Sequence, residues 1–192
     1  KIGFIPIVVH GGGKRISNKL NDLGIKSEFI KGLRVTGKET IEVVEQILIE
    51  FNQEIVEALK KHSCNSEKIN SKNNNIISVL KQNDELGFVG TPTKIDKTII
   101  DKIVKDKKIP VIAPLGLDEN NQTYNINADT AAGFIAKKIE ARRLIIMSDV
   151  EGVLDDSQKL ISEINSTSIK DLIDNETITG GMIPKINNCL DV

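Results

Sequence analysis

The sequence predicts an α/β fold in which helices cover a largely parallel sheet. An apolar, β-branched run at 5–9 leads into Gly11-Gly12-Gly13, as a buried strand leads into a tight turn. From Lys14 the apolar residues recur at helical spacing, and the same succession of strand and helix returns later in the chain. Such alternation is typical of parallel strands joined by helices.

The first two predicted helices follow from apolar spacing and from their end signals. One carries Ile16, Leu20 and Leu23 on one face and stops at Gly24, because glycine readily adopts the left-handed conformation that ends helices. Thr36 and Glu39 have the spacing of a capping box, so a long helix is expected from there to about Lys61. Its predicted inward face consists of Ile41, Val44, Leu48, Phe51, Ile55 and Leu59.

The middle of the chain predicts shorter elements. Residues 64–75 are rich in Asn, Ser and Lys and indicate a loop, after which strands are expected at 76–80 and 86–89. Asp96 can cap a helix that carries Ile99, Ile100, Ile103 and Val104, and the strand 109–114 follows it.

The last third repeats the same logic. Asn127 can cap a helix bearing Ala131, Ala132, Ile135 and Ile139, and a strand is expected at 144–147. Two further helices are predicted, from about Ser168 and from near Gly181.

Composition excludes several classes of partner. The 26 basic residues balance 27 acidic ones for a net charge of -1, which removes the broad positive field that nucleic acid or anionic lipid would require. No apolar run reaches the roughly 20 residues that a bilayer requires. Cys64 and Cys189 lie far apart without a metal-ligand pattern, so neither zinc nor a disulfide framework is expected. The bias toward Lys, Ile and Asn indicates an AT-rich genome, which favours a plastid stroma, with a low-GC bacterial cytoplasm as the alternative.

Two early features could bind an anion. The glycine turn exposes backbone N–H groups at a helix start, where a carboxylate or phosphate is stabilised, although a plain tight turn explains it as well. His10 precedes the turn, and an ordinary packed or solvated histidine is its simplest interpretation. Arg34 lies between a strand and a helix, where its planar fork could grip a carboxylate; a solvated surface arginine is the alternative.

Three later segments could carry chemistry. In 124–129, Asn125 can donate to a carboxylate and Asp129 can orient cationic groups, although helix capping also accounts for this pattern. Residues 148–153 follow a predicted strand, where α/β folds place ligand-binding loops, and a turn is the alternative. Lys185 follows a double glycine near a helix start, so its ammonium could reach a phosphate or simply be solvated.

Taken in order, six segments resemble the successive motifs of acetylglutamate kinases, and the similarity spans essentially all 192 residues. The narrowest part is Leu33-Arg34-Val35-Thr36 combined with Asn125, Asn127 and Asp129, since triple glycines occur in other amino acid kinases too. The segments are 8–13, 32–36, 87–90, 124–132, 148–154 and 180–185.

The resemblance implies an amino acid kinase-like, three-layer αβα sandwich with a mainly parallel central sheet. Roughly residues 1–120 would form the acetylglutamate-binding lobe, and roughly 121–192 part of the nucleotide-binding lobe. The implied reaction is ATP-dependent phosphorylation of the side-chain carboxylate of N-acetyl-L-glutamate in arginine biosynthesis. The cofactor would be ATP with Mg²⁺, and because Mg²⁺ is held largely by the nucleotide phosphates, no metal-ligating residue is assigned.

The resemblance also implies roles for particular residues. Gly12 and Gly13 would give N–H groups to the substrate, Arg34 and Asn125 would bind N-acetylglutamate, Asp129 would organise the active site and Lys185 would stabilise the phosphoryl group in transit. The nucleotide site would be lined by Asp149, Val150, Glu151, Gly152, Val153, Leu154, Thr177, Ile178 and Thr179.

Two departures from the family pattern stand out. The family's opening strand with its lysine and glycine pair would precede Lys1, and the carboxy-terminal part of the nucleotide lobe is also missing, so the chain by itself is expected to have little kinase activity. Asn70-Ser71-Lys72-Asn73 replaces a Ser-Gly-Lys-Asp type of turn, which leaves the geometry of this loop open.

Other functions stay open. A kinase of the same fold could act on aspartate, glutamate, carbamate or UMP, although Arg34 and Asn125 argue against this. A non-catalytic regulatory or arginine-sensing module is an alternative from another class, and a dinucleotide-binding protein fits the glycine spacing poorly. The resemblance further implies a homodimer or hexamer, and it allows a PII signal protein as a partner.

Overall fold

The computed structural model describes residues 4–148, 151–155, 157–178 and 182–190. The chain forms two compact units, Lys1–Ala131 and Ala132–Val192, and the boundary lies inside helix α4 (Ala128–Lys138). In the described ranges, no helix has the length and apolar character needed to cross a bilayer.

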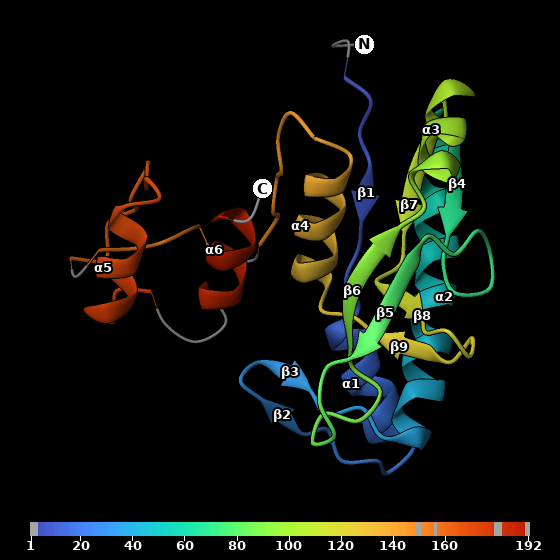
Figure 1. Cartoon of the computed structure of the whole chain (residues 1–192), viewed down its shortest axis with the longest axis horizontal. Helices are drawn as coiled ribbons and strands as arrows, with labels where there is room; N and C mark the ends of the chain where they lie inside the picture. Colours follow the sequence, from blue (N-terminus) through green and yellow to red (C-terminus); the bar gives the residue numbers. More distant parts are fainter. Residues whose placement is uncertain (1–3, 149–150, 156, 179–181, 191–192) are drawn as a thin grey trace. The chain divides into compact units, whose positions relative to one another are not determined.

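Parallel pairing organises the first sheet of unit 1. Strand β7 (Ile109–Ile112) lies between β1 (Val8–Val9) and β4 (Ser66–Ile69), and both neighbours run parallel to it (Figure 1). Parallel neighbours cannot be joined by a tight turn, so the chain must return through helical connections. This confirms the α/β class that the alternating sequence pattern predicted.

A second, mixed sheet of unit 1 has the order β6 (Gly90–Ile95), β5 (Ile77–Lys81), β8 (Leu115–Leu117) and β9 (Thr123–Asn125). Its outer pairs are antiparallel and its central pair is parallel. The predicted strand at 76–80 is confirmed by β5.

A small hairpin joins β2 (Phe29–Ile30) to β3 (Leu33–Arg34). Both residues of its turn have positive φ, 49° at Lys31 and 81° at Gly32. This backbone matches the right-handed twist of paired strands, and it explains why a glycine occupies the second turn position.

In the described residues of unit 1, three helices lie wholly within the unit: α1 (Gly13–Asp22), α2 (Lys38–Lys61) and α3 (Lys97–Lys105). Asp96 caps α3 as predicted, because its carboxylate accepts the Thr98 N–H at 3.0 Å. Gly24 follows α1 with a φ of 71°, which confirms the stop signal. Helix α2 packs against α1, β4, β7 and β9. One core cluster contains Ile16, Leu20, Ile41, Val44, Leu48, Ala113 and Leu115.

The prediction for the start and inward face of α2 was partly wrong. Gly37 is the N-cap and there is no side-chain cap; the Thr36 hydroxyl donates instead to the Arg34 carbonyl at 2.8 Å. The fully buried positions are Ile41, Val44, Leu48, Asn52 and Val56, whereas Phe51, Ile55 and Leu59 are half-buried. Asn52 can face inward because its side-chain amide forms hydrogen bonds with other buried polar groups.

Other predicted elements also need correction. The segment 64–75, predicted as a loop, contains strand β4, which the polar sequence did not indicate. The predicted strand 86–89 forms two isolated bridges instead. Leu23 lies beyond α1 and is half exposed. The strand expected at 144–147 is absent, since no described strand pairs with it; Ile145 and Met147 are 79% and 91% exposed.

The described part of unit 2 contains the end of α4, then α5 (Ser168–Asp174) and α6 (Met182–Leu190). These confirm the helices predicted from about Ser168 and near Gly181, although Gly181 itself lies outside the described residues. Between α4 and α5, Leu154 and Leu160 form an isolated antiparallel bridge.

Candidate functional site

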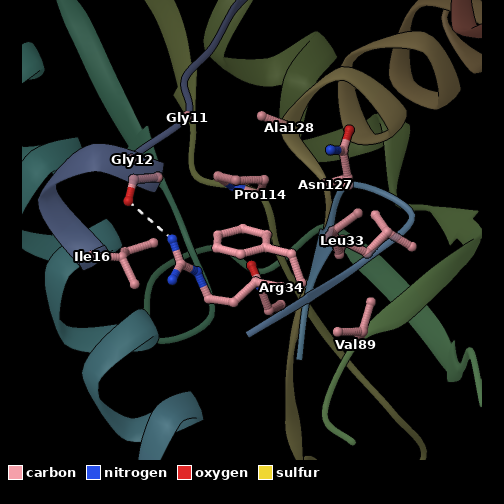
Figure 2. Close-up of a pocket in the computed structure, with 14 residues that line it drawn as sticks. Gly11, Gly12, Ile16, Leu33, Arg34, Val89, Pro114, Asn127 and Ala128 are labelled. Atoms are coloured by element: carbon pink, nitrogen blue, oxygen red, sulfur yellow. Dashed lines mark hydrogen bonds between the residues drawn. The ribbon is translucent and has the colours of Figure 1, made fainter. Parts of the chain in front are cut away.

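A cavity of about 190 Å³ opens in unit 1 where β1 and β7 end (Figure 2). Ligands of parallel sheets usually bind beyond the carboxyl ends of the strands. The segments that line the cavity lie far apart in sequence: 11–13 and Ile16, Phe29, 32–34, Val89, Pro114 and 125–128. Arg34 is the one charged residue among them, so the lining carries a positive charge and no carboxylate.

The glycine turn forms one wall of this cavity. Gly12 is the N-cap of α1, and a Cβ at this position would lie 2.7 Å from Leu48 Cδ2, so the close approach of α2 requires glycine here. Gly12 has no side chain to cap the first turn, and α1 has no acidic residue there. Backbone N–H groups at the helix start are therefore available to an anion.

Arg34 is fixed in place by three hydrogen bonds. Its Nη1 donates to Ser27 Oγ at 2.7 Å, and its Nη2 donates to Gly13 O at 3.0 Å and to Ser17 Oγ at 2.9 Å. The guanidinium also lies over the Phe29 ring, 4.6 Å from its centroid. The side chain is pre-organised at the cavity, which lowers the entropy cost of gripping a ligand.

The charge of Arg34 is buried, and the described part of the chain places no counter-ion beside it. The residue is only 7% exposed, and among the described residues no carboxylate lies within salt-bridge distance of it. Burial lowers the pKa of Arg34, although a guanidinium remains protonated at neutral pH. A buried cation that lacks a counter-ion is stabilised by an anionic ligand.

Asn125 is connected to Arg34 through one hydroxyl. Its Nδ2 donates to Thr36 Oγ1 at 3.3 Å, and that hydroxyl donates onward to the carbonyl of Arg34. Thr36 is fully buried, so this link is shielded from water. The fold therefore brings together all four predicted substrate-binding residues, Gly12, Gly13, Arg34 and Asn125, around one cavity.

Asp129 and Lys185 lie in different elements of different units. Asp129 is in the first turn of α4, next to the cavity-lining Ala128, and Asn127 caps that helix by accepting the Thr130 N–H at 3.0 Å. Lys185 is half-buried in α6.

The predicted nucleotide-binding residues lie in unit 2. Asp149, Val150 and Thr179 are outside the described residues. Glu151 is exposed, Gly152 has a φ of 148°, and Val153 is buried; Leu154 is bridged to Leu160, Thr177 is half-buried, and Ile178 is 1% exposed. In the described residues these two segments contain bends and one isolated bridge rather than helix or extended sheet.

Sequence reasoning missed two residues beside and beneath the site. Neither Phe29, whose ring lies under the Arg34 guanidinium, nor Asn52, which is 0% exposed, was singled out. One signal was available for Asn52: an amide that follows Val44 and Leu48 at the same four-residue spacing.

Asn70 determines the geometry of the loop 70–73, which the sequence left open. Its Oδ1 accepts the N–H groups of Lys72 and Asn73 at 3.1 and 3.0 Å, and its own N–H donates to Asn73 O. An Asx-type turn thus replaces the glycine-containing turn.

Comparison with known sequences gives consistent matches. The model of the amino acid kinase family matches residues 2–192. The acetylglutamate kinase of Pelagibacter ubique is 64% identical over all of this chain and 67% of its own length. That of Campylobacter fetus subsp. fetus is 47% identical over 99% of this chain and 69% of its own. The chain thus spans about two thirds of these relatives.

Solved structures agree on the fold. Smu.665 from Streptococcus mutans superposes with a TM-score of 0.91 at 31% identity, covering 96% of this chain and 76% of that one. An N-acetylglutamate synthase from Neisseria gonorrhoeae, complexed with coenzyme A and N-acetyl-glutamate, superposes with a TM-score of 0.81 over 97% of this chain and 43% of its own. At 18% identity this second likeness shows the fold alone.

The predicted plastid origin receives no support from these relatives, which are bacterial. The Lys, Ile and Asn bias reflects base composition, and a low-GC bacterium produces it equally well.

Proposed function

This chain belongs to the amino acid kinase family, and on that premise we propose that it binds N-acetyl-L-glutamate for ATP-dependent phosphorylation of the side-chain carboxylate, a step of arginine biosynthesis in a bacterial cell. The observation that carries the proposal is the buried, unneutralised guanidinium of Arg34 beside the glycine turn. The relatives named acetylglutamate kinase support the same reading.

The cavity favours an N-acylated ligand. A free amino acid carries an ammonium group, and the lining offers no carboxylate to pair with it. Acetylation removes that charge and leaves two carboxylates, which suits a site that contains one guanidinium and backbone N–H donors. The volume also lies below the roughly 300–1,000 Å³ of pockets for drug-sized ligands, as suits a small metabolite.

In this assignment Arg34 and Asn125 bind one end of the substrate, and the N–H groups of Gly12 and Gly13 face the carboxylate that is phosphorylated. Asp129 organises the active site, and Lys185 stabilises the phosphoryl group in transit through its positive charge. These groups orient and neutralise two anionic reactants, which is the main requirement of phosphoryl transfer.

ATP with Mg²⁺ is assigned to unit 2. The non-helical segments 151–154 and 177–178 provide backbone groups of the kind that nucleotides use, and within the described ranges there is no cluster of three metal-ligating side chains. This donor set fits a magnesium ion held mainly by the nucleotide phosphates. When bound, Mg²⁺-ATP supplies the phosphoryl group.

Isothermal titration calorimetry on this chain tests the substrate. N-acetyl-L-glutamate is expected to saturate one site per chain, whereas L-glutamate, L-aspartate and UMP should bind at least tenfold more weakly. Equal affinity for L-glutamate and its N-acetyl derivative would refute the assignment, because it would mean that the ammonium group finds a partner.

A further inference from the structure

A buried polar network lies directly behind the glycine turn. His10, Asn52 and Asn70 are 7%, 0% and 1% exposed, and hydrogen bonds connect them in a row. Asn52 Nδ2 lies 3.1 Å from His10 Nε2, and Asn70 Nδ2 donates to Asn52 Oδ1 at 3.3 Å. At the other end of the row, His10 Nδ1 lies 2.9 Å from the carbonyl oxygen of Gly11.

Only one assignment of protons satisfies this row. Asn52 Nδ2 lies 3.0 Å from the Val111 carbonyl, which can only accept, so the amide nitrogen must be on this side. The same NH₂ group then donates to His10 Nε2, which must be unprotonated. The proton of the neutral ring is therefore on Nδ1, from which it donates to Gly11 O.

This hydrogen bond sets the direction of the next peptide group. In a trans peptide the C=O and the following N–H point in opposite directions. Because the hydrogen bond from His10 points the Gly11 carbonyl oxygen toward the imidazole ring, the N–H of Gly12 points away from that ring. Gly11 and Gly12 both line the cavity, where Figure 2 labels them.

We propose that His10 is a positioning residue, whose Nδ1–H holds the Gly11–Gly12 peptide so that the Gly12 N–H faces the acidic ligand, and that Asn52 fixes the tautomer this requires. The identity of the ligand rests on the proposed function, whereas the tautomer and the peptide orientation do not.

Replacing His10 by asparagine or by glutamine can separate this positioning role from a purely structural one. Asparagine at position 10 places its NH₂ near the location of Nδ1 and keeps the bond to Gly11, but it leaves the fully buried Asn52 amide short of an acceptor. Glutamine reaches the location of Nε2, so it keeps the acceptor for Asn52. It loses the hydrogen bond to the carbonyl oxygen of Gly11, a residue that is exposed to solvent.

Stability and affinity should therefore rank the variants in opposite orders. His10→Gln should unfold at higher urea than His10→Asn, because an unsatisfied buried donor costs more than a carbonyl that water can reach. His10→Asn should bind N-acetyl-L-glutamate within about threefold of the unmodified chain, and His10→Gln about tenfold more weakly. His62, the second histidine, is exposed, so His62→Gln serves as the matched control and should change neither quantity.

An affinity order that follows the stability order would overturn the proposal, since that is the result of a purely structural histidine. ¹⁵N NMR of the imidazole rings provides a second, ligand-free measurement, with His62→Gln assigning the two rings. The His10 ring is expected as the neutral Nδ1–H tautomer at pH 7, and an Nε2–H or charged ring would refute the proposal.

The two proposals fail in distinguishable ways. If the unmodified chain binds no N-acetyl-L-glutamate, the proposed function fails, and the ring tautomer still decides the positioning role. If either variant does not fold, the tautomer in the unmodified chain decides it alone.

Discussion

The guanidinium of Arg34 donates a hydrogen bond to the carbonyl oxygen of Gly13 over 3.0 Å, which ties together two motifs 21 residues apart. The same nitrogen also bonds Ser17, so the arginine is attached to the first turns of α1. A ligand that contacts Arg34 therefore lies beside the backbone N–H groups at the start of this helix, and both can act on one small anion.

Replacing Arg34 by lysine should separate charge from geometry. An ammonium keeps the charge but lacks the planar fork, so N-acetyl-L-glutamate should bind about 10- to 100-fold more weakly, with ATP affinity unchanged. Calorimetry with each ligand measures both effects. Arg15→Lys is the matched control, because Arg15 is exposed and pairs with Glu54 outside the cavity lining. Equal losses for the two ligands would contradict the role of Arg34.

Gly12→Ala and Gly13→Ala form a matched pair at the glycine turn. A Cβ at Gly12 would meet the buried Leu48, whereas one at Gly13 would meet no atom within 4 Å. Gly12→Ala should therefore lower the free energy of unfolding by about 1–3 kcal/mol, and Gly13→Ala should leave it nearly unchanged. Urea denaturation compares them, and similar losses would show that α2 does not restrict this turn.

The stability of the fold should fall as the pH drops below about 6.5. Burial lowers the pKa of His10 below its ordinary value of 6.5, and the hydrogen bond to Gly11 opposes this only in part. Between the folded-state pKa and 6.5 the unfolded chain binds more protons than the folded one, so the free energy of unfolding rises with pH in that window and reaches its full value above it.

Urea denaturation between pH 7.5 and pH 5.5 measures this dependence. His10→Gln should reduce the slope, and His62→Gln should retain it. The Phe51 ring stands edge-on to His10, and the Arg15 guanidinium lies over that ring. A slope that is unchanged in His10→Gln would assign the pH dependence to other groups.

Asp96 should stabilise α3 through its cap. Asp96→Ala removes the acceptor of the Thr98 N–H, and a lost N-cap costs about 1 kcal/mol. Asp101→Ala, at an exposed position of the same helix, is the control and should change stability by less than about 0.5 kcal/mol. Equal effects of the two changes would show that the cap contributes little.

Several elements could be predicted because their signals are local. The cap at Asp96, the stop at Gly24 and the cap at Asn127 depend on side chains within a few residues of the helix ends. The β4 strand and the missing strand at 144–147 could not be predicted in this way, since a strand exists only through its pairing with a distant segment. The polar residues of β4 form a strand because Ser66–Ile69 pairs with β7.

The sequence by itself determined the α/β class, the glycine turn and the types of side chain that an anion would need, because periodicity and helix-end chemistry act over short distances. Tertiary structure alone decided that Arg34 would be buried with no described carboxylate paired to it, that Asn52 would face inward to His10, and that Asn125 would reach Arg34 through Thr36. Those outcomes depend on which distant segments pack together, and desolvation there gives an ordinary arginine and an ordinary histidine properties that their sequence neighbours do not specify.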